Sequence, residues 1–447
     1  MLGKDQKPEN LSNRWLTVSA EVPSPPRSAI AGWLPVSLTS VVASVFFLTW
    51  LFFPPVAREL GPITLRKEDV VRFLPLVLVL IFDPRRLVFR WHWIDVPVIV
   101  YCLCPLVCGL ANHLDWRDSL WETVKEFGYW FVPYFLGRAI FRDAASRRSL
   151  AIVVLIAAAC YVPPTVFEIF NGPELTAWVT GHELSGQNAG AARGTTFRPS
   201  VFLSSGFVLT MFYVLATLMA VGLAWAGADS TFNSRWLYLA AFLCVVVVLA
   251  CKSLGSIVLL GVGLITMLIC RWTRVRYWLI PLAMVAPLYI GMRSSGLVTT
   301  NGVHAIAAQL VSADRAGSLA YRLRAEDIVF QRMHGHWWLG FGDFGLWRQD
   351  AKVMALDGFW LFALTRTGTL SVVAWLAMVT IPIVIRACSR KDADGRTGWI
   401  SLTFALFLAL SLVDSMLNYF GDAPQMLLVG VVSSQAAVVN RKFLVLR

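Results

Sequence analysis

Arginines gather in two stretches of the sequence, around Arg193 and Arg198 and again around Arg315 and Arg322. Arginine presents a planar fork of donors that pairs with phosphate oxygens and keeps its charge at physiological pH. Arg315 and Arg322 are seven residues apart, so a helix would place both at the edge of one face. Several such arginines at a membrane surface would suit a pyrophosphate, whereas each one alone fits an interfacial anchor equally well.

Three further residues are candidates for chemistry. Asp357 stands at the expected start of an apolar helix, where a carboxylate either caps the helix or takes a proton from an attacking hydroxyl. His336 lies in a turn rich in Gly and Trp, and a lone histidine in such a turn fits a structural role as well as a catalytic one. Lys252 occupies a tight turn between two apolar runs, as a phosphate contact or an anchor. Because no cluster has metal-ligand spacing, we expect neither a metal nor a cofactor.

The second arginine stretch has a helical pattern. Leu319, Leu323 and Phe330 share one helical face, and the arginines lie at its edge. This pattern predicts an amphipathic helix that lies flat on a membrane with its guanidinium groups at headgroup level.

The composition predicts that the chain lies in a membrane. Of its 447 residues, 57% are hydrophobic and 15% charged, whereas soluble proteins carry about 25% charged residues. The formal net charge of +12 is scattered through short loops, which is typical of membrane topology and argues against nucleic acid as a partner.

Apolar runs of helical length recur along the whole chain and predict an all-α polytopic fold with about 10–12 transmembrane helices. The runs lie at 30–53, 71–83, 93–111, 119–138, 149–169, 200–226, 236–252, 254–270, 277–292, 358–386, 398–417 and 422–440. We therefore expect a single membrane domain, 28–447, after a polar, Pro-rich tail, 1–27.

Basic residues cluster in alternate loops, which predicts that both termini are cytoplasmic. Two longer loops, 170–199 and 293–357, then face the other side, and loops of that length are usually functional or disordered. Arg366 falls inside the tenth apolar run and needs a partner there, for which Asp414 is a candidate.

Taken together, these segments resemble the O-antigen ligase and Wzy-type polysaccharide polymerase family of bacterial inner-membrane glycosyltransferases. The similar segments are Arg193-Gly-Thr-Thr-Phe197, Lys252-Ser253, Ser318-xxx-Arg322, His336-Trp-Trp-Leu-Gly340-Phe-Gly342 and Asp357-Gly-Phe-Trp-Leu361-xx-Leu364-xxx-Gly368. The resemblance implies a variant of the membrane C-type glycosyltransferase fold, with the large loop 293–357 periplasmic.

The resemblance also implies an activity. Glycan would pass from an undecaprenyl-pyrophosphate donor to an acceptor sugar hydroxyl on the periplasmic face, without metal. Arg193 and Arg322 would neutralise the pyrophosphate, and Asp357 would stand where ligases have a catalytic histidine, which favours a polymerase of exopolysaccharide or O-chain. The implied partners are the lipid-linked donor, an acceptor glycan or lipid-linked glycan, the bilayer and other polysaccharide-assembly proteins.

The sequence leaves three alternative functions open. A ligase would transfer the glycan to a lipid acceptor, and a flippase would move lipid or polysaccharide with a similar number of helices. A flippase usually carries internal repeats and discontinuous helices, which the sequence does not indicate. A non-catalytic assembly subunit is the third.

Overall fold

The structure is a computed structural model, and it describes residues 37–55, 58–60, 63–88, 90–181, 192–193, 196–227, 233–310, 313–342, 358–389, 398–418 and 422–445. The predicted tail, 1–27, and Asp357 lie outside these residues. Residues Leu38–Arg447 belong to one compact unit.

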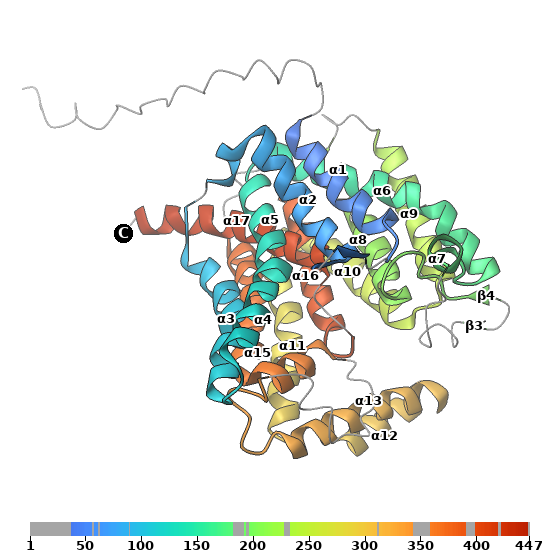
Figure 1. Ribbon diagram of the computed structural model, residues 1–447. Helices are drawn as coiled ribbons and strands as arrows, with labels where there is room; N and C mark the ends of the chain where they lie inside the picture. The colour runs from blue at the N-terminus through green and yellow to red at the C-terminus, as the bar shows by residue number, and fades with distance from the viewer. Residues whose placement is uncertain are drawn as a thin grey trace, which may run out of the picture. The chain divides into compact units, whose positions relative to one another are not determined.

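The first half of the chain is built from helices that follow one another closely (Figure 1). Its elements are α1 (Leu38–Phe52), β1 (Arg58–Leu60), β2 (Ile63–Leu65), α2 (Lys67–Phe82), η3 (Pro84–Leu87), η4 (Trp93–Asp95), α3 (Val96–Ala111), α4 (Trp116–Glu126), η5 (Phe127–Phe131), α5 (Val132–Ile140), α6 (Ala144–Asn171) and α7 (Leu175–Thr180). The elements η3 and η4 are 3-10 turns, and η5 is a π-helical turn that joins α4 to α5.

The second half continues in the same way after a short hairpin. Its elements are β3 (Ala192–Arg193), β4 (Thr196–Phe197), α8 (Gly206–Ala226), α9 (Ser234–Ala250), α10 (Leu254–Thr273), α11 (Leu279–Ser294), α12 (Thr300–Leu310), α13 (Ala313–Arg332), α15 (Phe359–Cys388), α16 (Gly398–Asp414) and α17 (Ala423–Val445). Apart from two short antiparallel hairpins, β1–β2 and β3–β4, the described fold is helical, so the all-α prediction is confirmed.

Each of the twelve apolar runs contains a helix, but the helices differ in length. Five segments in the described residues are long and apolar enough to cross a membrane: Trp93–Ala111, α6, α8, α10 and α15. Four more apolar helices, α1, α9, α11 and α16, have 15 to 17 residues. They fall just short because a helix needs about 20 residues to span the hydrocarbon core.

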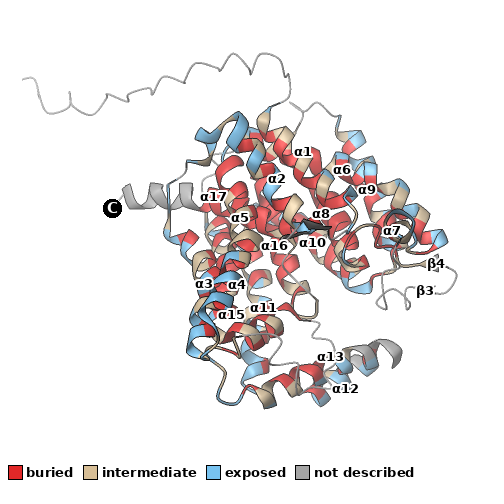
Figure 2. Ribbon diagram, in the orientation of Figure 1, coloured by how far each residue is buried: buried red, intermediate tan, exposed pale blue. Residues whose placement is uncertain are grey.

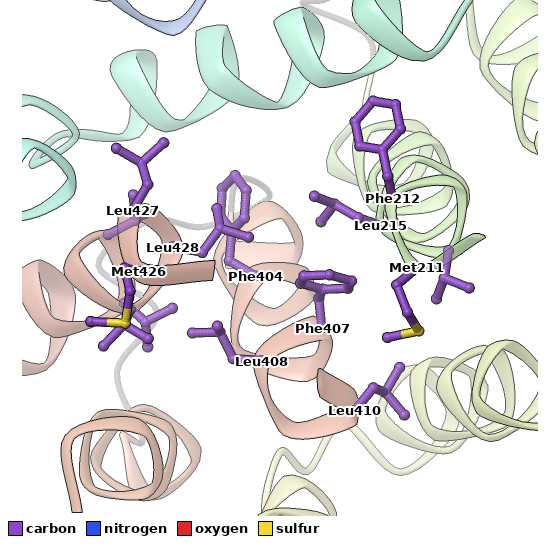
Figure 3. Packing of buried hydrophobic residues seen from close by; sticks show 14 of the residues in the cluster. Met211, Phe212, Leu215, Phe404, Phe407, Leu408, Leu410, Met426, Leu427 and Leu428 are labelled. Carbon is purple, nitrogen blue, oxygen red and sulfur yellow. The ribbon is translucent and has the colours of Figure 1, made fainter. Parts of the chain in front are cut away.

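Helices α8 and α16 form the centre of the unit. Most residues of both are buried, as expected for helices that are apolar on all sides (Figure 2). Helix α16 packs against α8, α10, α11, α15 and α17. Figure 3 shows Leu215 of α8 and Leu428 of α17 on either side of Phe404 of α16.

The Gly-rich turn at 336–342 fills a break in α15. The helix is interrupted at Gly368, where φ is 75° and ψ is −171°. The Phe341 N–H donates to the Thr365 carbonyl at 2.9 Å, and the Gly342 N–H donates to the Arg366 carbonyl at 2.9 Å. The turn therefore supplies donors for carbonyls that the interrupted helix leaves without its usual partners.

Candidate functional site

Several sequence-distant segments meet at a cavity of about 420 Å³. We call it the arginine cavity. It lies among the start of α8, the turn between α9 and α10, helix α13 and the end of α16. Its lining residues are Arg198, Phe207, Ser253, Leu254, Gly255, Val258, Leu259, Leu319, Arg322, Val413, Asp414, Met416, Leu417 and Asn418.

Two of the predicted arginines converge here on one aromatic ring. The guanidinium carbon of Arg198 lies 3.5 Å from the centroid of Phe207, and that of Arg322 lies 5.9 Å from it. Arg198 also donates to the Ser253 hydroxyl at 3.5 Å, and Arg322 donates to the Leu417 carbonyl at 3.2 Å. The structure thus brings Arg198 and Arg322 together at one cavity, although they are 124 residues apart in the sequence.

The N-terminus of α10 adds to the positive potential of the cavity. Leu254 and Gly255, the first residues of this helix, line the cavity beside Ser253. The first N–H groups of a helix have no acceptor within the helix and favour an anion. Lys252 precedes them in the predicted turn, in a left-handed conformation with φ of 51°. A helix end and two guanidinium groups together form an environment for a phosphate or diphosphate.

The lining of the cavity also includes a carboxylate, which sequence analysis did not place in the site. Asp414 ends α16 and accepts a hydrogen bond from the Asn418 side chain at 2.7 Å. The charges of Arg322 and Arg198 both act on this carboxylate. The sequence indicated a special role for Asp414 only by placing an acidic residue near the end of an otherwise apolar run.

The segment that carries Arg198 is held by a buried carboxylate on α6. Glu168 accepts backbone hydrogen bonds from Ser200 at 2.9 Å, Val201 at 2.6 Å and Leu175 at 3.3 Å. Glu168 is fully buried, so these bonds are shielded from water. They fix the backbone just after Arg198 and so aim its side chain at the cavity.

We expect Glu168→Ala to destabilise the protein because it leaves three N–H groups without their acceptor, and those of Ser200 and Val201 are buried, at about 1–3 kcal/mol for each buried group left without a partner. Thermal unfolding of the purified protein in detergent measures this loss. Glu174→Ala is the matched control, since the Glu174 side chain makes no cap hydrogen bond at the start of α7. Equal unfolding temperatures for the two variants would contradict the role assigned to Glu168.

Helix α13 is held to α11 by an ion-pair network around the buried side chains of Arg293 and Glu326. Arg293 pairs with Glu326 at 2.6 Å and with Asp327 at 2.8 Å, and Tyr289 donates to Glu326 at 2.9 Å. Burial raises the pKa of Glu326, and the bonds from Arg293 oppose that rise. Because Glu326 lies one helical turn after Arg322, this network also holds the part of α13 that carries Arg322.

The amphipathic pattern predicted for this region corresponds to α13. Leu323 is buried, Leu319 lines the arginine cavity and Phe330 stacks on Trp337 with centroids 5.7 Å apart. The apolar face of the helix thus packs against the protein, and its edge carries Arg322 into the cavity.

The other predicted site residues lie elsewhere or outside the description. His336 lies in the turn that fills the α15 break and stacks on Phe341 with centroids 4.4 Å apart. Arg193 belongs to β3 and Arg315 to the first turn of α13, and neither side chain is described. Asp357 is outside the described residues, while the next residue, Gly358, packs against the carbonyl of Met416 in the cavity wall.

The partner expected for Arg366 was wrong. Arg366 pairs with Glu126 at 2.5 Å and with Glu122 at 2.7 Å, not with Asp414. Both glutamates belong to α4, an amphipathic helix whose side chains meet α15 beside its break. This leaves Asp414 to the arginine cavity.

The chemistry of the arginine cavity therefore rests on two guanidinium groups, a helix N-terminus and one carboxylate. Within the described part of the chain, no group of three His, Cys, Asp or Glu residues is arranged to hold a metal ion. The sequence matches no protein-family model and no curated protein.

Proposed function

We propose that this protein is a membrane glycosyltransferase of the O-antigen ligase and polymerase type, and that it polymerises a surface or exopolysaccharide. The substrate would be a glycan on undecaprenyl pyrophosphate, and the acceptor a sugar hydroxyl. The observation that carries the proposal is the arginine cavity, where Arg198 and Arg322 face the Asp414 carboxylate beside the N-terminus of α10.

In this mechanism the acceptor oxygen attacks the anomeric carbon of the donor sugar. The bond between that carbon and the pyrophosphate oxygen breaks, and Arg198 and Arg322 stabilise the negative charge that the leaving group gains. A carboxylate takes the proton of the acceptor hydroxyl. Asp414 lines the cavity and Asp357 precedes Gly358 at its wall, so these two are the candidates. A single displacement of this kind inverts the anomeric configuration.

The placement in the membrane follows from the same proposal. The four shorter apolar helices and the remaining apolar runs would cross the bilayer with the five long segments, giving the 10–12 crossings expected from the sequence. The protein would then lie in the bacterial inner membrane with both termini in the cytoplasm and the arginine cavity on the periplasmic side. The donor lipid would enter from the bilayer between helices.

Purified protein in nanodiscs, supplied with an undecaprenyl-pyrophosphate oligosaccharide, tests the activity. We expect longer glycans together with released undecaprenyl pyrophosphate, separated and identified by mass spectrometry. Transfer only to a different added lipid acceptor would identify a ligase. If the glycans stay unchanged in nanodiscs and the lipid crosses the bilayer of proteoliposomes, the protein is a transporter and not a glycosyltransferase.

The break in α15 is a feature that many transporters share. Transporters often hold ions or substrates at the break of a discontinuous helix, and α15 is interrupted at Gly368. Here, however, the turn occupies the break, and the carbonyls of Thr365 and Arg366 accept bonds from Phe341 and Gly342. The protein itself thereby fills the break, which argues against an ion or substrate site there.

A further inference from the structure

A second cavity, of about 160 Å³, lies between the start of α2 and the segment 202–204. We call it the α2 cavity. Its lining residues are Trp50, Pro55, Lys67, Glu68, Val71, Arg72, Phe202, Leu203, Ser204, Asp422 and Ala423. Two cations lie in its wall almost entirely out of solvent, since Lys67 is 5% and Arg72 is 6% exposed. Buried cations are costly unless a partner compensates them.

Arg72 has two hydrogen-bond donors without a partner in the described part of the chain. Its guanidinium carbon lies 4.0 Å from the centroid of the Tyr129 ring. Its Nε and Nη1 atoms are buried and have no hydrogen-bond partner among the described residues. Lys67 differs, because its ammonium donates to the Phe202 carbonyl at 2.7 Å. Arg72, with these two unpaired donors, is thus one of the residues that line a cavity with room for a small ligand.

The α2 cavity also offers an unmet acceptor. The Oδ2 atom of Asp422 is buried and has no partner in the described part of the chain. Burial lowers the pKa of Lys67 to about 8. Glu68 is the other acidic group in the wall, and it is exposed. The buried charges are thus two cations and one carboxylate, and the second carboxylate of the wall, Glu68, is the one that reaches solvent.

We propose that the α2 cavity binds an oxyanion, a carboxylate or a phosphate, that carries a neighbouring hydroxyl group. The oxyanion would accept from Nε and Nη1 of Arg72 in the charge-assisted geometry that guanidinium groups favour. The hydroxyl would donate to Oδ2 of Asp422, and Trp50 would form an apolar wall. Acidic sugars and sugar phosphates have this combination of groups. The site is separate from the arginine cavity and does not depend on glycan transfer.

Isothermal titration of the full chain in detergent, with glucuronate, glucose 6-phosphate and glucose as probes, tests the site. We expect glucuronate or glucose 6-phosphate to bind and glucose to show no saturable heat. Binding of glucuronate alone would identify a carboxylate site, and binding of glucose 6-phosphate alone a phosphate site. Arg72→Gln should weaken the binding at least tenfold, and Arg117→Gln, an exposed arginine outside the cavity, should leave it unchanged.

Thermal unfolding of the same samples distinguishes loss of binding from loss of fold. A bound ligand raises the unfolding temperature of the native protein, so the acidic probe should raise it for wild type and not for Arg72→Gln. Arg72→Lys keeps the charge without the planar fork and should bind several-fold more weakly than wild type. Equal binding of glucose, no binding of either acidic probe, or unchanged affinity in Arg72→Gln would each overturn the proposal.

Discussion

Replacing Arg322 with alanine is expected to lower the rate of undecaprenyl-pyrophosphate release by about 100-fold or more, the size of effect seen when a group that stabilises transition-state charge is removed. Arg322 lines the arginine cavity, and its guanidinium faces Phe207 and the Leu417 carbonyl. The loss should fall mainly on kcat, because the negative charge on the leaving group grows as the bond breaks. Release of the lipid, followed in detergent by mass spectrometry, measures the rate.

The same helix provides the control. Arg324 is two residues further along α13 and is exposed, so Arg324→Ala removes an equal charge from the same element without touching the cavity. We expect this variant to keep nearly full activity. Arg322→Lys should recover only part of the rate, because a lysine offers a point charge and not a fork of donors. Full activity in Arg322→Ala would remove this residue from the mechanism.

Gly368→Ala is expected to be among the most destabilising single substitutions in the chain. Gly368 has φ of 75°, a region that costs other residues about 1–3 kcal/mol. In addition, an added Cβ would lie 2.3 Å from the Trp338 carbonyl oxygen, so the turn would have to move out of the α15 break. We expect a loss of at least about 3 kcal/mol from the two effects together, read as a lower unfolding temperature in detergent.

Gly261→Ala is the matched comparison for this loss. Gly261 lies inside α10, where an added Cβ would meet no atom within 4 Å. Alanine favours a helix more than glycine does, so this change should leave the stability equal or slightly higher. If both alanine variants unfold at the wild-type temperature, the close approach between α15 and the turn is not important for stability.

The helices were predictable because burial leaves a periodic or continuous apolar pattern in the sequence. The twelve runs each hold a helix, and the alternation of Leu319 and Leu323 with arginines predicted α13. The break in α15 left no such pattern. A glycine in an apolar run is tolerated in many helices, and only the backbone approach of Trp338 gives Gly368 its role.

Contacts between distant segments were harder to predict than the elements themselves. An apolar pattern says which face of a helix is buried and not which neighbour covers it. Arg366 was expected to need a partner, but sequence alone did not distinguish Asp414 from Glu126, and the structure selects the glutamate. Lys67 and Arg72 passed unnoticed because charges at the start of a helix are usually exposed, whereas these two are buried.

The backbone from Arg198 to Phe207 borders both cavities. Arg198 and Phe207 line the arginine cavity, and Phe202 and Ser204 line the α2 cavity. Anything that binds on one side and shifts this wall must change the free energy of binding on the other side. Such linkage is reciprocal, so an acidic sugar in the α2 cavity would alter the affinity for the lipid pyrophosphate by the same factor as the lipid alters the affinity for the sugar. A single wall of ten residues would thus make the two binding equilibria one thermodynamic system.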